Sequence, residues 1–104
     1  MSKANADYIS ELRAQDPFTG YRVPIEETGG FAKVRFVMRG EWAFYEAHGR
    51  ATLLEAFAGR GLIHRGSIER WDDGSKISEA DRDVIVEHVS AALRSAGNDV
   101  IRVV

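Results

Sequence analysis

Cysteine is absent from this chain of 104 residues. Its absence excludes disulfide bonds and cysteine-based zinc sites, and it fits a reducing compartment. No apolar run approaches the roughly 20 residues that a membrane-spanning helix needs. The opening residues, MSKANADYIS, also lack the apolar core of a signal peptide. Together these absences predict a soluble cytoplasmic protein without a membrane segment.

An excess of positive charge is also missing. The formal net charge is -2 and the sequence pI is near 5.9. A protein that binds nucleic acid through phosphates would usually carry a basic face, so this balance argues against nucleic acid as a partner. It leaves basic protein partners open.

Catalytic and metal-binding patterns are lacking as well. The histidines, at positions 48, 64 and 88, lack the i,i+4 spacing and the accompanying glutamate of a zinc helix. Ser67 and Ser78 lack a nucleophile-elbow setting, and the glycines form no phosphate loop. Carboxylates available for acid-base work are expected to be solvated: Glu41, Glu46, Glu55, Asp72 and Asp73. No catalytic residue, metal ligand or cofactor is therefore predicted.

What is present fits one domain over residues 1–104. With 44% hydrophobic and 29% charged residues, a chain of this length buries about two-thirds of its unfolded surface in a single core. Residues 4–15 can form a short helix with Tyr8, Ile9 and Leu12 on one side. The alternative, a frayed tail over residues 1–16, stays open.

The clearest helix signal runs from about residue 77 to residue 96. Ser78 suits the N-cap, Asp81 faces the positive end of the helix dipole, and Gly97 with Asn98 tolerates the left-handed conformation that ends a helix. We expect His88 to border the buried stripe with a satisfied hydrogen bond. The stripe contains Asp81, Ile85, His88, Val89, Ala92 and Ala96, with Ile77 and Leu93 at its margins.

Short strands separated by turn residues fill the rest of the chain. Residues 31–39 alternate most plainly, and Pro24 suggests an edge strand because proline cannot donate to the ladder. Residues 51–58 are compatible with helix, but their shortness favours a strand. The predicted class is α+β, an antiparallel sheet of five or six strands with the long helix on one face. The predicted strands are 21–27, 31–39, 42–47, 51–58, 62–71 (with a bend or bulge at Gly66) and 99–104.

The aromatic residues suggest how the sheet is oriented. Trp42 and Phe44 share a strand face and are expected to be core residues. If they face the helix, Tyr45 and Glu41 face solvent on a sheet surface that no second helix covers. Glu46 lies on the other face unless a bulge re-aims it. Trp71 is either a lid on the core, which the nearby helix start favours, or an anchor for a partner.

Three stretches of the second half of the chain carry a family resemblance: YEAHGR at 45–50, SIERW at 67–71, and ISEADRDVIVEHVSAAL at 77–93. Their order resembles that in small bacterial immunity proteins, which neutralise secreted polymorphic toxins. The resemblance implies a non-catalytic cytoplasmic inhibitor that binds one cognate toxin domain. It leaves the toxin's activity undefined.

For such an inhibitor we expect acidic groups around an aromatic anchor, since toxins that act on nucleic acids are often basic. The predicted partner-binding residues are Glu41, Tyr45, Trp71, Asp72 and Asp73. Two other classes stay open. A small enzyme would show a concave pocket with convergent polar groups, and a self-associating regulatory or assembly module would show a concentration-dependent mass.

Overall fold

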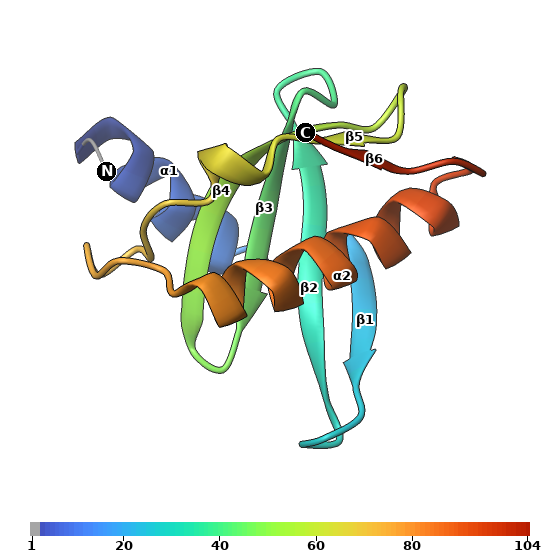
Figure 1. Ribbon diagram of the computed structural model, residues 1–104. Helices are drawn as coiled ribbons and strands as arrows, with labels where there is room; N and C mark the ends of the chain where they lie inside the picture. The colour runs from blue at the N-terminus through green and yellow to red at the C-terminus, as the bar shows by residue number, and fades with distance from the viewer. Residues whose placement is uncertain (1–2) are drawn as a thin grey trace.

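The computed structural model describes residues 3–104 and has the predicted α+β class. A six-stranded curled sheet with the strand order β1-β2-β3-β4-β5-β6 lies between two helices (Figure 1). The elements are α1 (Lys3–Arg13), β1 (Tyr21–Ile25), β2 (Gly30–Val37), β3 (Trp42–Ala47), β4 (Arg50–Phe57), β5 (Leu62–Ile63), the short 3-10 helix η1 (Arg65–Ser67), α2 (Glu79–Ser95) and β6 (Arg102–Val103).

Strands β1 to β4 form consecutive antiparallel hairpins, as the sequence predicts. β1 is an edge strand, which confirms the prediction from Pro24. The β3–β4 turn has positive φ at His48 and Gly49, the backbone of a tight two-residue hairpin turn. The β2–β3 turn begins earlier than predicted, because Met38 and Arg39 also adopt positive φ ahead of Gly40.

Helix α2 has the cap that the sequence predicts. The Ser78 hydroxyl accepts a hydrogen bond from the Asp81 backbone N–H at 3.1 Å, and Gly97 takes positive φ after the last turn. The predicted stripe is mostly buried, although Ala96 is exposed, and Ser90, which is not a member of the predicted stripe, is buried. The buried residues of α2 are Ile85, His88, Val89, Ser90, Ala92 and Leu93.

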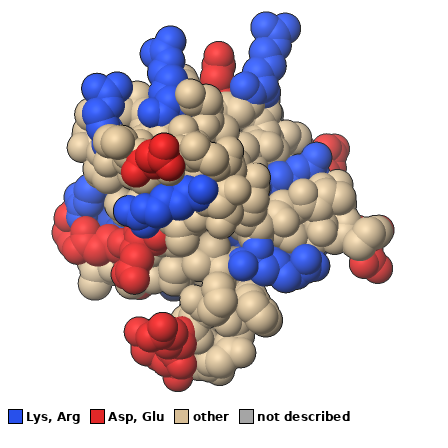
Figure 2. Space-filling view, turned by 90° about the vertical axis from the view of Figure 1, so that its right-hand side faces the viewer, with Lys and Arg blue, Asp and Glu red and all other residues tan. Residues whose placement is uncertain are grey.

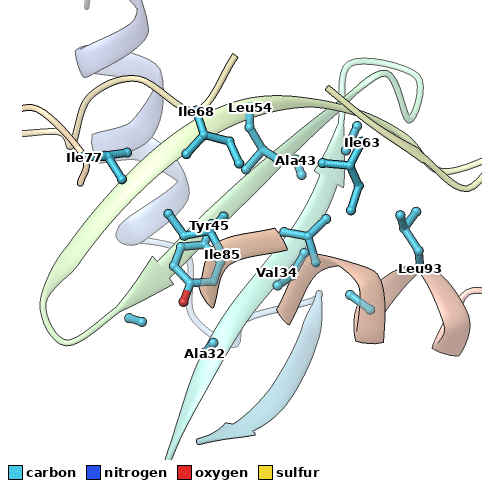
Figure 3. Packing of buried hydrophobic residues seen from close by; sticks show 14 of the residues in the cluster. Ala32, Val34, Ala43, Tyr45, Leu54, Ile63, Ile68, Ile77, Ile85 and Leu93 are labelled. Carbon is cyan, nitrogen blue, oxygen red and sulfur yellow. The ribbon is translucent and has the colours of Figure 1, made fainter. Parts of the chain in front are cut away.

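The predicted orientation of the sheet is wrong. Tyr45, not Phe44, faces α2, because Tyr45 pairs with Val34 and shares its face. Figure 3 shows Tyr45, Val34 and Ile85 pointing toward one another from two strands and α2. Tyr45 is only 2% exposed, so its expected place on an open sheet surface is excluded.

The opposite sheet face is not open either, because α1 covers it. Phe44 is fully buried there, and Trp42 packs at the margin of the same cluster. The members of this second core are Ile9, Leu12, Phe18, Val37, Phe44, Ala51 and Leu53, with Tyr8 and Trp42 packed against them. The N-terminal helix is therefore a structural layer rather than a tail.

The segment 62–71 is not one long strand. Only β5 pairs in the sheet before η1 turns the chain, and Arg70 forms an isolated bridge with Lys76. The predicted last strand, 99–104, is reduced to the two residues of β6. β6 pairs with β5 in parallel, so the prediction of an entirely antiparallel sheet is wrong for this pair. The sheet is consequently mixed.

Candidate functional site

The predicted partner-binding residues do not form one surface. Glu41 precedes β3, whereas Asp72 bonds to Ala51 at the start of β4, beside the other end of β3. β3 has six residues and so spans about 20 Å. Glu41 and the turn after Trp71 therefore lie at opposite ends of the sheet.

Both aspartates after Trp71 hold local structure. Asp72 accepts hydrogen bonds from Arg13 and from the Ala51 backbone N–H, and so connects α1 to β4. Asp73 accepts from the backbone N–H of Ser75 at 2.8 Å and from the Ser75 hydroxyl, and these bonds lower the pKa of Asp73. Their carboxylates shape the turn before α2.

Trp71 is a lid on the core. Its side chain is 5% exposed, with the Tyr45 ring at 6.5 Å between centroids and the Arg50 guanidinium 4.4 Å from the indole centroid. The indole Nε1 is enclosed and has no hydrogen-bond partner among the described residues. Trp71 is thus not an exposed anchor.

Beside this lid lies a cleft of about 430 Å³ between β1, α2 and the β3–β4 turn. Its volume is within the range of small-ligand sites. The floor contains Tyr45, Ile85 and His88. The other lining residues are Val23, Pro24, Ile25, Glu26, Glu27, Thr28, Ala47, His48, Arg50, Trp71, Asp81, Val84, Glu87 and Ala91.

Tyr45 and His88 form a hydrogen-bonded pair at the floor. The Tyr45 hydroxyl lies 2.8 Å from Nδ1 of His88, and the two rings stack with centroids 5.9 Å apart. Burial, with the charge of Asp81, raises the pKa of Tyr45, so the hydroxyl keeps its proton. Burial is also the main reason that the pKa of His88 is lowered, against the attraction of Glu87 and Glu27. The pair is neutral near pH 7.

The hydrogen bond fixes which histidine nitrogen carries the proton. His88 is the one hydrogen-bond partner of the Tyr45 hydroxyl among the described residues, so the buried O–H donates to Nδ1. Nε2 of His88 then bears the ring proton. Nε2 has no partner within residues 3–104, and it is not among their enclosed unpaired atoms. A free N–H donor therefore opens into the cleft.

Carboxylates surround the mouth of the cleft: Glu26, Glu27, Asp81 and Glu87. None of them forms an ion pair with another described side chain. They outnumber the single guanidinium that lines the cleft, which belongs to Arg50. Figure 2 shows acidic atoms on the lowest protrusion, at the height of the β1–β2 turn in Figure 1. The cleft is net negative.

A second, shallower hollow of about 340 Å³ contains Glu55, His64 and Ser67. Nδ1 of His64 lies 2.6 Å from the Glu55 carboxylate, which resembles half of a catalytic triad. The Ser67 hydroxyl, however, donates to the His64 carbonyl and accepts from the Glu55 backbone N–H. Ser67 holds the backbone of η1 against β4 and is not oriented as a nucleophile.

Within residues 3–104, no group of three or more His, Cys, Asp or Glu side chains is placed to hold a metal ion. No helix in this described part combines the length and apolar character needed to cross a membrane. Comparison with protein-family models, curated proteins and solved structures finds no match.

Most residues of this cleft were not predictable as site residues from the sequence. Glu26 and Glu27 lie in the turn after β1, and Glu87 is not a member of the predicted buried stripe of the helix. One signal was present, because a histidine on a buried helical stripe needs a polar partner. That expectation for His88 is confirmed, and the partner is Tyr45.

Proposed function

We propose that this chain is a non-catalytic, cytoplasmic immunity protein that binds and neutralises a cognate secreted bacterial toxin. The proposal begins from the sequence resemblance and is supported by where the resembling stretches lie. The three stretches, 45–50, 67–71 and 77–93, are separate in sequence but meet around one cleft.

The contacts between these stretches carry the proposal. Tyr45 bonds His88, Arg50 stacks on Trp71, and Trp71 packs against Tyr45. An acidic cleft is complementary to the basic surface of a nucleic-acid-directed toxin, which favours fast and selective association.

The test is protection from toxicity. The toxin domain encoded beside this gene would be expressed in a susceptible bacterium, with and without this chain. We expect growth arrest by the toxin alone, restored growth on co-expression, and a complex that co-purifies in a fixed stoichiometry. Toxicity that persists at equal amounts of the two proteins would contradict the proposal.

A small enzyme is the second candidate, and the cleft is the specific observation that favours it. A neutral tyrosine–histidine pair at the floor of a cavity is a group that can move a proton. The two candidates differ in the amount of this chain, relative to the toxin, that is needed for protection. An enzyme would protect at amounts far below those of the toxin and would lose protection in His88→Gln, whereas an inhibitor protects only when it matches the toxin.

A further inference from the structure

We infer that the cleft beside Tyr45 and His88 receives a basic residue, arginine or lysine, from a loop of the partner protein. The inference rests on the proposed function, because it takes the occupant to be part of a protein. It adds the contact site and the chemistry that the partner must present.

The charge of the cleft mouth is the first reason. Glu26, Glu27, Asp81 and Glu87 come from the β1–β2 turn and from α2, two elements far apart in the sequence. These carboxylates outnumber the single lining guanidinium, that of Arg50, and form no ion pair with a described side chain, so the cleft attracts an incoming cation. A guanidinium or ammonium group matches this arrangement.

The floor supplies an independent reason. His88 is 9% exposed, and its Nε2–H faces the cleft without an acceptor among the described residues. Because Nε2 is not enclosed, an acceptor that enters the cleft can reach this donor. A backbone carbonyl on the partner's loop satisfies this donor, while a basic side chain on that loop satisfies the carboxylates.

The rim favours a long basic side chain over a small inorganic cation. Val84 is 45% exposed on α2, and both Val84 and Ala91 line the cleft. The methylene stem of arginine or lysine covers such apolar surface while its charged end reaches polar groups. The cleft therefore matches an amphipathic occupant.

The experiment uses acetyl-arginine-methylamide as the probe, because it carries one guanidinium and two amide carbonyls. The chain has two tryptophans, so the Trp42→Phe variant leaves a single indole N–H resonance, that of Trp71 in the cleft wall. We expect this resonance to shift saturably in ¹H–¹⁵N spectra, with a dissociation constant of roughly 1–10 mM. The acetyl-glutamate and acetyl-norleucine methylamides are the matched probes and should not bind.

Charge-neutralising variants locate the binding. Glu27→Gln/Glu87→Gln should weaken probe binding by about tenfold or more. Asp7→Asn/Asp99→Asn removes the same charge from exposed positions outside the cleft and should leave binding unchanged. The inference is overturned if the arginine probe does not saturate, if the norleucine probe binds equally well, or if both double variants weaken binding equally.

The toxin assay separates this inference from the proposed function. If Glu27→Gln/Glu87→Gln is folded and protects as well as the parent, the cleft is not the contact site, although the immunity function stands. If the arginine probe binds as expected but no neighbouring toxin is neutralised, the cleft stands as a site for basic residues and the immunity function fails.

Discussion

At the scale of single residues, the Tyr45–His88 bond links the sheet to α2 within the core. Both side chains are buried, at 2% and 9% exposure, and each is the other's hydrogen-bond partner among the described residues. A polar pair in an apolar core is stable only while both members are satisfied. The pair therefore contributes to stability as well as to the chemistry of the cleft.

Tyr45→Phe tests the stabilising role. The substitution leaves the shape of the ring but removes the donor to Nδ1 of His88, so we expect the free energy of unfolding to fall by about 1–2 kcal/mol. Urea denaturation measures it. Tyr21→Phe is the control, because the half-buried Tyr21 packs edge-on against Phe36 and its hydroxyl has no bond within the described residues. Equal losses in both variants would show that the bond contributes nothing.

The lowered pKa of His88 predicts a loss of stability in mild acid. In the unfolded chain histidine titrates near pH 6.5, whereas in the folded protein His88 resists protonation until a lower pH. Between these two values the unfolded state binds more protons, so stability falls as pH decreases below about 6.5. The charged or titratable groups that act on His88 are Glu27, Glu87 and His48.

Unfolding midpoints at pH 7.5 and pH 5.5 measure this effect. We expect the unfolding midpoint of the parent to be lower at pH 5.5 than at pH 7.5. In His88→Gln the difference between the midpoints at these two pH values should be smaller than in the parent. Asp73 and Glu79 do not interfere, because hydrogen bonds to Ser75 and Arg65 lower their pKa values and their effect appears only in stronger acid. A difference that is unchanged in His88→Gln would rule out His88 as its source.

At the scale of secondary-structure elements, local signals were predictable and the choice of face was not. The Ser78 cap and the Gly97 stop depend on a few neighbouring residues, and the sequence located both. Alternation in β3 separates two sets of side chains, but both sets are buried because helices cover both faces. Alternation alone therefore could not show whether Tyr45 or Phe44 faces α2.

The segment from 62 to 71 shows a different limit. Its composition favours a strand, but the backbone leaves the sheet after Ile63. Ser67 determines this turn through bonds to His64 and Glu55. Hydrogen bonds from a side chain to backbone groups compete with the backbone pairing of a strand. The β-propensity of the residues does not include that competition.

Ile9→Ala tests whether α1 is a structural layer. Ile9 is 1% exposed in the second core, so we expect a loss of about 2–5 kcal/mol in the free energy of unfolding. Ser10→Ala is the control, because Ser10 is exposed on the same helix. If Ile9→Ala unfolds at the same urea concentration as the parent, α1 does not cover the sheet in solution.

At the scale of the whole molecule, the cleft depends on the complete topology. Its acidic rim combines the β1–β2 turn with α2, and its floor adds β3. Sequence spacing cannot predict a site whose members are spread from Val23 to Ala91, because only the register of β2 and β3 places Tyr45 under α2. The helix signal did predict that His88 would be buried with a polar partner, and the sheet supplied that partner.

The last prediction concerns whether the two cores unfold together. Trp42 borders the core under α1, and Trp71 belongs to the core under α2, so each tryptophan reports on one face of the same sheet. β3 and β4 contribute side chains to both cores, so loss of either one exposes the sheet that supports the other. In Trp42→Phe and Trp71→Phe, fluorescence of the remaining tryptophan should therefore change at the same denaturant concentration as far-UV circular dichroism of that variant. Separate midpoints in either variant would show that one face opens independently, and the α1 side, which has the smaller buried cluster, would be expected to open first.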